Sequence, residues 1–186
     1  MEDHAREQVT NRKRFARIIV PILIVMAVTG IWVASNVNTT QTVDYALDNP
    51  DFALFADNGI DLDHLKSYGV PMMIYFGTEW CPPCREMKPS VIDLHSRVGE
   101  QMIIKIIDTD EMPEFTSNFP VRAIPTQFFF DGNGGAFIPD RAMPIQLIPY
   151  VLEGTEDIAL TAHEGLMKES ALLELIDAMG VKLSDE

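Results

Sequence analysis

The sequence is poor in cysteine. Only two occur among the 186 residues, Cys81 and Cys84, and they are three positions apart. Two cysteines cannot supply a framework of several disulfides, a four-cysteine zinc site or a cysteine-ligated iron–sulfur cluster. With 47% hydrophobic residues, a chain of this length can bury a sizeable core without disulfides. Its length predicts one domain with appendages.

Basic residues are also scarce. The chain has 14 Lys and Arg against 28 Asp and Glu, a net charge of −14, which argues against nucleic-acid binding. The deficit is uneven, because residues 1–17 hold five Lys/Arg against three acids, a balance of +2. All later residues together hold nine Lys/Arg against twenty-five acids, a balance of −16. This split indicates two different environments.

A long apolar run separates the two charge regions. Residues 18–34 (IIVPILIVMAVTGIWVA) carry no charge, and no charged residue follows before Asp44. A helix of roughly 20 residues crosses the hydrocarbon core of a bilayer, and basic flanks stay on the cytoplasmic side. We therefore predict a cytoplasmic segment at 1–17, a single-pass anchor in the plasma membrane at 18–35, a linker at 36–50 and an extracytoplasmic domain at 51–186. The alternative is a signal peptide cleaved near residues 33–35.

The remaining chain predicts an α/β domain with a mixed sheet and flanking helices. Apolar runs predict strands, and apolar residues at helical spacing predict helices. Strands are expected at 52–56, 72–76, 102–107, 125–130 and 158–163, the last at a sheet edge. Helices are expected at 61–68, 84–98 and 168–179, with a short helix or turn at 111–119. The proline-containing segment 136–157 is expected to be irregular.

The two cysteines lie in Trp80-Cys81-Pro82-Pro83-Cys84, directly after a predicted buried strand and at the start of a predicted helix. A CxxC pair alone is a weak signal, because zinc ribbons share it. In this context two cysteines at i and i+3 can close a small disulfide ring. Unpaired amides at the helix start favour a thiolate on the first cysteine. Cys81 is therefore predicted to attack and Cys84 to resolve the mixed disulfide.

At these residues the chain resembles the thioredoxin family, over about residues 51–182. The resemblance rests on Phe76-Gly77-Thr78-Glu79-Trp80-Cys81-Pro82-Pro83-Cys84, on Val121-Arg122-Ala123-Ile124-Pro125-Thr126, and on Gly165 with the final helix. It implies a thioredoxin fold and a cis peptide bond before Pro125, beside the disulfide. It also implies a substrate site formed by Trp80, Pro82, Pro83, Ile124 and Pro125.

The chain is more narrowly similar to membrane-anchored, extracytoplasmic thioredoxin-like proteins. That likeness implies protein disulfides as substrates, including apocytochrome c or other exported proteins. It also implies a transmembrane thiol carrier of the cytochrome-biogenesis type as electron donor. Ile124 before Pro125 resembles reducing thioredoxins, so we predict a reductase. The alternatives are a disulfide oxidase or isomerase, and a binding module that uses the fold only for docking.

Two features depart from the family pattern. A buried acid commonly lies six residues before the first cysteine, where it assists proton transfer, but this chain has Tyr75 there. A water, Glu79 or Glu86 are alternatives for that role. The segment 136–157 is an insertion, interpreted either as a decorated sheet edge or as a surface that docks a partner.

Other groups suggest less specific roles. The four histidines have no metal-ligand spacing with the cysteines, so neither a metal nor another cofactor is expected. The methionines fall mostly at core positions. Lys105 interrupts a predicted apolar strand. Its side chain is expected either to be buried near the cysteines or to reach solvent from a sheet edge.

Overall fold

The computed structural model describes residues 49–56 and 60–183. The predicted cytoplasmic segment, the anchor at 18–35 and most of the linker lie outside these residues. Within the described ranges, no helix is both long and apolar enough to cross a bilayer.

A five-stranded mixed sheet organises the domain, in the order β2-β1-β3-β5-β4. Its strands are β1 (Met72–Gly77), β2 (Ile103–Asp108), β3 (Thr126–Phe130), β4 (Ile148–Val151) and β5 (Ile158–Glu164). β1 pairs with β2 in parallel, and the other pairs are antiparallel. The central strands β1 and β3 are buried along their whole length, as their continuous apolar sequences predict.

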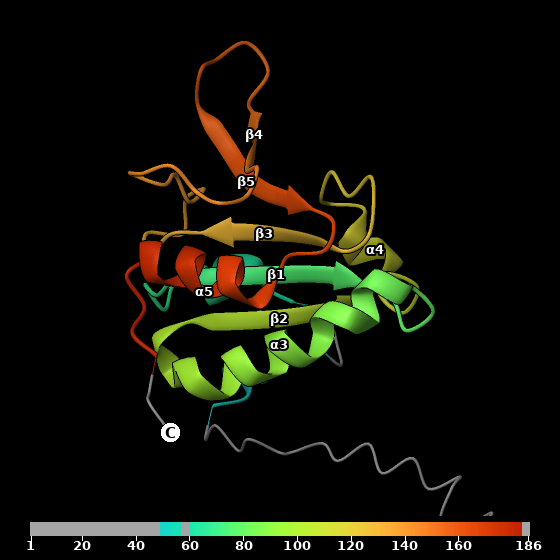
Figure 1. Cartoon of the computed structure of the whole chain (residues 1–186). Helices are drawn as coiled ribbons and strands as arrows, with labels where there is room; N and C mark the ends of the chain where they lie inside the picture. Colours follow the sequence, from blue (N-terminus) through green and yellow to red (C-terminus); the bar gives the residue numbers. More distant parts are fainter. Residues whose placement is uncertain (1–48, 57–59, 184–186) are drawn as a thin grey trace, which may run out of the picture. The chain divides into compact units, whose positions relative to one another are not determined.

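Helices cover both faces of the sheet. In Figure 1, α3 (Pro82–Val98) and α5 (Glu169–Ala178) lie in front of it, and α4 (Pro113–Thr116) lies behind. Strand residues alternate between the two resulting cores, so Phe129 packs on the α3 and α5 side and Phe128 on the opposite side. The smaller elements are α2 (Leu62–Lys66) and the 3₁₀ turns η1 (Pro50–Phe52) and η2 (Gly99–Gln101).

The expected strand at 52–56 is wrong in extent. The chain forms η1 first, with the Asn49 side chain accepting a hydrogen bond from the Asp51 amide. Only Phe55 then makes a bridge, in parallel with Ile106 of β2. The apolar run is real, but the Asn-Pro-Asp sequence before it favours a turn.

The segment 136–157 is more ordered than expected, because it contains β4. β4 pairs with β5 along Ile148–Val151, so β5 lies inside the sheet and β4 forms the edge. The prediction of an edge strand at 158–163 is therefore wrong. Pro149 obscured the strand in the sequence, since proline is tolerated in a sheet chiefly at an edge.

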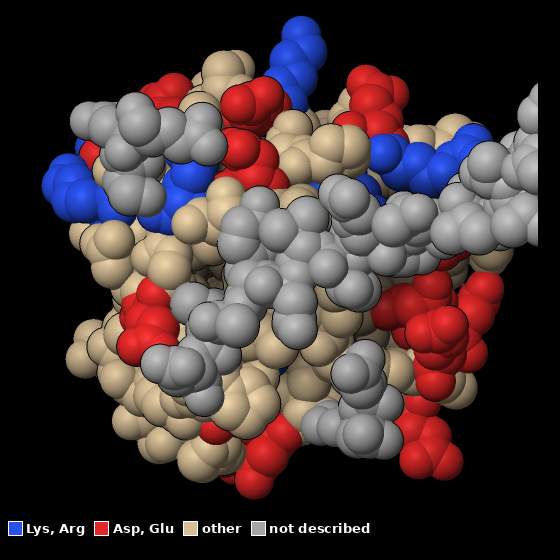
Figure 2. Space-filling model, turned by 90° about the horizontal axis from the view of Figure 1, so that it is seen from below, with Lys and Arg blue, Asp and Glu red and all other residues tan. Residues whose placement is uncertain are grey.

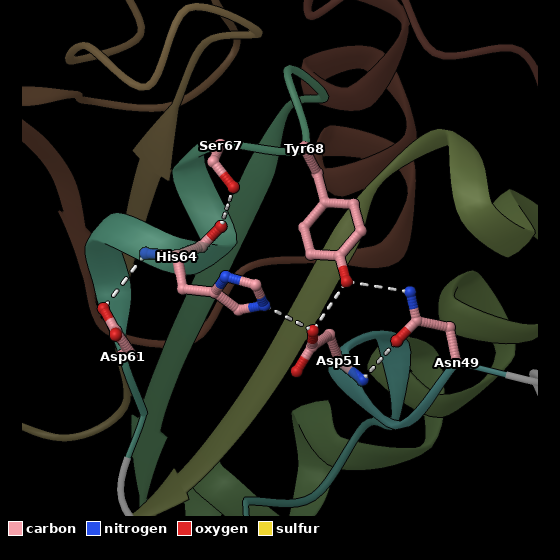
Figure 3. Close-up of polar contacts among 6 residues, drawn as sticks. All are labelled: Asn49, Asp51, Asp61, His64, Ser67 and Tyr68. Atoms are coloured by element: carbon pink, nitrogen blue, oxygen red, sulfur yellow. Dashed lines mark hydrogen bonds and ion pairs between the residues drawn. The ribbon is translucent and has the colours of Figure 1, made fainter.

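A polar cluster joins η1 to α2 (Figure 3). The Asp51 carboxylate accepts a hydrogen bond from the Tyr68 hydroxyl at 2.6 Å, and its Oδ2 lies 2.9 Å from His64 Nε2. Asn49 Nδ2 donates to the Tyr68 hydroxyl at 3.0 Å. Asp61 caps α2 by accepting from the His64 amide. The cluster fixes the first described residues against the domain.

Replacing Asp51 with Asn should lower the free energy of unfolding at pH 7 by about 0.5–1 kcal/mol, because two side-chain hydrogen bonds are weakened at a partly exposed site. The Tyr68 hydrogen bond, and then His64, hold the pKa of Asp51 below its usual range. Because the pKa of Asp51 is lower in the folded than in the unfolded state, its ionised carboxylate stabilises the fold at every pH above the unfolded-state pKa, near 3.9. This stabilisation is lost as the pH falls through the folded-state pKa.

The difference between wild type and Asp51→Asn should therefore shrink below about pH 4. Urea unfolding at several pH values measures it, with Asp140→Asn, an exposed acid, as the control. A difference that stays constant with pH would contradict the assignment.

Candidate active site

The two cysteines lie where β1 ends and α3 begins. β1 ends at Gly77, and the Cys81 amide then donates to the Thr78 carbonyl at 3.4 Å, closing a turn. α3 begins at Pro82 rather than at the expected residue 84, with Cys81 as its N-cap. Prolines at the first two helical positions suit this start, because their missing N–H groups have no partner there.

Cys81 and Cys84 form a disulfide, with their Cα atoms 5.2 Å apart. Both residues are only 3% exposed. The Cys84 amide points at Cys81 Sγ, 3.3 Å away, in the first turn of α3. A thiolate on Cys81 would be stabilised there by this amide and by the helix dipole. The arrangement suits the predicted roles of Cys81 as nucleophile and Cys84 as resolving thiol.

The loop before β3 lies against the disulfide. The Ile124–Pro125 peptide bond is cis, as the family resemblance implies, and the Ile124 carbonyl oxygen lies 3.7 Å from Cys81 Sγ. Pro125 is buried, and its carbonyl accepts a hydrogen bond of 2.7 Å from the Gly165 amide. Ile124 is half-buried. The structure therefore brings Ile124 and Pro125 together with the cysteines.

Trp80 is the most exposed large apolar residue among those described, at 67%. Its indole N–H donates to Asp110 at 2.7 Å. Pro82 is exposed and Pro83 half-buried, while Leu166, beside Gly165, adds a further exposed apolar residue. Together these residues offer apolar surface next to the cysteines and to the loop that carries Pro125. Leu166 was not anticipated from the sequence.

Acidic residues lie next to this surface. Asp108 is the last residue of β2, and Asp110 and Glu111 follow it; β2 ends at the same edge of the sheet as β1. Figure 2, which views the domain from below, shows acidic side chains gathered toward that end. Of the two glutamates considered for proton transfer, Glu79 pairs with Lys88 and Glu86 is exposed on α3.

The edge strand β4 supports the loop that carries Pro125. The Tyr150 hydroxyl donates to Glu164 Oε1 at 3.1 Å, and Arg122 donates to both of these side chains. Arg122 also lies over the Tyr150 ring. The insertion therefore contacts the cis-proline loop, a link that no local sequence pattern signals.

The remaining candidates lie apart from the cysteines. Lys105 is buried in β2 and donates to the Ala53 carbonyl at 2.6 Å. His95 is buried in α3, with its Nε2 2.7 Å from the Phe52 carbonyl. Within the described ranges, no group of three or more His, Cys, Asp or Glu side chains could hold a metal ion.

Sequence comparisons agree with this geometry. The sequence model of the thioredoxin family matches residues 62–142. A thioredoxin of Rhodospirillum rubrum is 37% identical over 89 residues, covering 48% of this chain and 85% of that protein. Thioredoxin 1 of Chlorobaculum tepidum is 30% identical, covering 45% and 83%. A solved structure, a mutant thioredoxin from Halobacterium salinarum, is 24% identical with a TM-score of 0.49, covering 74% and 97%.

A reversible dithiol at a helix start, facing a cis-proline loop, defines a thiol–disulfide oxidoreductase. The chain belongs to the thioredoxin family.

Gly77 has no room for a side chain. A Cβ atom there would lie 2.8 Å from Tyr75 Cε1 and 3.2 Å from Cys84 Sγ. Gly77→Ala should therefore destabilise the oxidised domain by about 1–3 kcal/mol, because buried groups must shift. Gly135→Ala is the control, since its Cβ would make only ordinary contacts, and should change stability by less than about 0.5 kcal/mol. Urea unfolding of both variants tests this, and equal effects would contradict it.

Proposed function

We propose that this protein is a membrane-anchored reductase of disulfides in exported proteins. Cys81 thiolate attacks a substrate disulfide, and one substrate sulfur leaves as a thiolate. Cys84 then attacks Cys81, which releases the second substrate sulfur and leaves the protein oxidised. Two electrons pass from the dithiol to the substrate, so the dithiol must be restored by a donor.

The observation that carries the proposal is the Cys81–Cys84 pair beside the Ile124–Pro125 bond. The half-buried Ile124 and the buried Pro125 give an extended substrate segment an apolar surface beside the disulfide. Trp80 and Leu166 add exposed apolar area next to the cysteines and to the Pro125 loop. The exposed Trp80 and Leu166 suit a protein substrate, because they can pack against apolar side chains of a polypeptide.

A reductase outside the cytoplasm needs electrons delivered across the membrane. The basic segment 1–17 and the apolar run 18–34 support an anchor with the domain on the far side. A transmembrane thiol carrier is the class of donor that suits this location. The anchor keeps the domain within reach of such a carrier.

A redox titration of the purified full-length chain tests the direction. Family potentials run from about −270 mV for thioredoxin to about −120 mV for a strong oxidant. We expect a midpoint near the reducing end. A midpoint above about −180 mV would instead support an oxidase or isomerase.

Membrane fractionation tests the anchor. The full-length chain should stay in the membrane pellet after alkaline extraction, and a chain lacking residues 1–35 should not. Reaction with a membrane-impermeant thiol reagent in intact cells should label the reduced cysteines. A mature protein that begins near residue 35 would show a cleaved signal peptide and overturn the anchor.

A further inference from the structure

Tyr75 occupies a buried position directly behind the active-site disulfide. It lies in β1, its side chain belongs to the same core as both cysteines, and it is only 2% exposed. Its hydroxyl donates a hydrogen bond of 3.1 Å to the carbonyl oxygen of Cys84. The tyrosine hydroxyl therefore contacts the backbone of the resolving cysteine.

The phenol and the Cys84 sulfur both contact the same residue, Gly77. A Cβ atom placed on Gly77 would be 3.1 Å from the Tyr75 hydroxyl oxygen and 3.2 Å from Cys84 Sγ. The hydroxyl and the sulfur therefore both pack against Gly77, which has no side chain to separate them. Since Cys84 is itself nearly buried, this hydroxyl is a polar group held next to a sulfur with little access to solvent.

The phenol keeps its proton in the pH range in which thiols titrate. Burial, and then the negative charge of Glu79, raise the pKa of Tyr75 well above its usual value. A group that stays protonated cannot accept the proton of Cys84, but it can donate a hydrogen bond. Buried thiolates are costly without such a donor.

We propose that the Tyr75 hydroxyl turns from the Cys84 carbonyl to the Cys84 sulfur and stabilises the thiolate that resolves the mixed disulfide. Cys84 loses its proton to water, and its thiolate attacks Cys81 Sγ. The Cys81–Cys84 bond forms as the bond from Cys81 to the substrate sulfur breaks. The substrate sulfur leaves with the bond's electron pair and takes a proton from water. Tyr75 donates a hydrogen bond throughout and changes neither charge nor oxidation state.

The two chemical steps can be separated with dithiobis(nitrobenzoate), because each releases one equivalent of coloured thionitrobenzoate. Attack by Cys81 is measured alone in Cys84→Ser, with and without Tyr75→Phe, in the full-length chain in detergent. Resolution is measured as the second release in chains that retain Cys84. Tyr68→Phe is the matched control, since that phenol bonds Asp51 and packs on the other core.

We expect Tyr75→Phe to leave the attack rate unchanged and to slow resolution about tenfold, equivalent to about 1.4 kcal/mol. The pH at which resolution reaches half its maximum should rise by about one pH unit, because the Cys84 thiolate loses a donor. Tyr68→Phe should change neither step.

Equal slowing of both steps would show a general packing role and overturn the proposal. An unchanged resolution rate and pH profile would also overturn it. The proposal rests on the dithiol chemistry, but not on its direction in the cell. A midpoint potential that contradicts the proposed reductase would not affect the expected role of Tyr75. Conversely, unchanged kinetics in Tyr75→Phe would overturn the role of Tyr75 without contradicting the reductase.

Discussion

Replacing Cys81 with Ser should reduce disulfide turnover by at least about a thousandfold, equivalent to about 4 kcal/mol of activation free energy. The hydroxyl of serine is almost wholly protonated near neutral pH. A thiolate at the N-cap of α3 is instead stabilised by the hydrogen bond that the Cys84 amide donates. Attack is the first chemical step, so no later step can compensate. Reduction of a cystine-containing protein measures the loss.

Cys84→Ser is the informative comparison. This variant should still attack, and should then stop with the substrate bound to Cys81 as a mixed disulfide. Non-reducing electrophoresis of cell extracts would display these adducts, and mass spectrometry would identify the trapped proteins. If Cys81→Ser forms adducts and Cys84→Ser does not, the two roles are reversed.

Replacing Phe128 with Ala should lower the free energy of unfolding by about 3–5 kcal/mol, the cost typical of removing a buried aromatic ring. Phe128 is fully buried in the central strand β3. Its ring lies 5.7 Å from that of Phe76, 5.1 Å from that of Phe119 and 6.2 Å from that of Tyr150. These rings pack tightly, so the cavity cannot close without moving several of them.

Phe55→Ala provides the comparison for this variant. Phe55 is 43% exposed and contributes a cation–π contact, with Lys88 Nζ 5.3 Å from the ring centroid. Its loss should cost less than about 1 kcal/mol. Chemical denaturation measures both variants. Phe128 faces away from the cysteines, so the Phe128→Ala variant should keep its redox activity at temperatures where it remains folded. Comparable losses of stability in Phe128→Ala and Phe55→Ala would contradict the packing described.

Much of the fold follows from local sequence signals. Continuous apolar runs identify the buried strands β1, β2 and β3, and Asp61 identifies the start of α2. The disulfide follows from two cysteines at a strand-to-helix junction, which is also a local feature. The cis bond before Pro125 came from family resemblance, since the sequence alone favours trans.

The missed features depend on tertiary contacts. β4 is recognisable only once β5 offers an edge with which to pair, and its proline argues against a strand in isolation. The contacts of Tyr150 with Arg122 and Glu164 join residues that are 28 and 14 positions apart. Tyr75 was visible as an exception to the family pattern, but its contact with Cys84 required the strand and the helix to be placed together.

The strand added at the sheet edge has a consequence for solubility. Exposed sheet edges are templates for pairing with other chains, and natural proteins protect them with short strands, proline, charge or covering loops. β4 has four residues, includes Pro149, which offers no N–H, and leads into the acidic turn that holds Glu153, Glu156 and Asp157. At the opposite edge, the Leu54 carbonyl accepts from the Ile106 amide and so covers part of β2. Both edges of the sheet are thus protected against strand pairing with other chains, which matters for a domain whose proposed function is to bind other polypeptides.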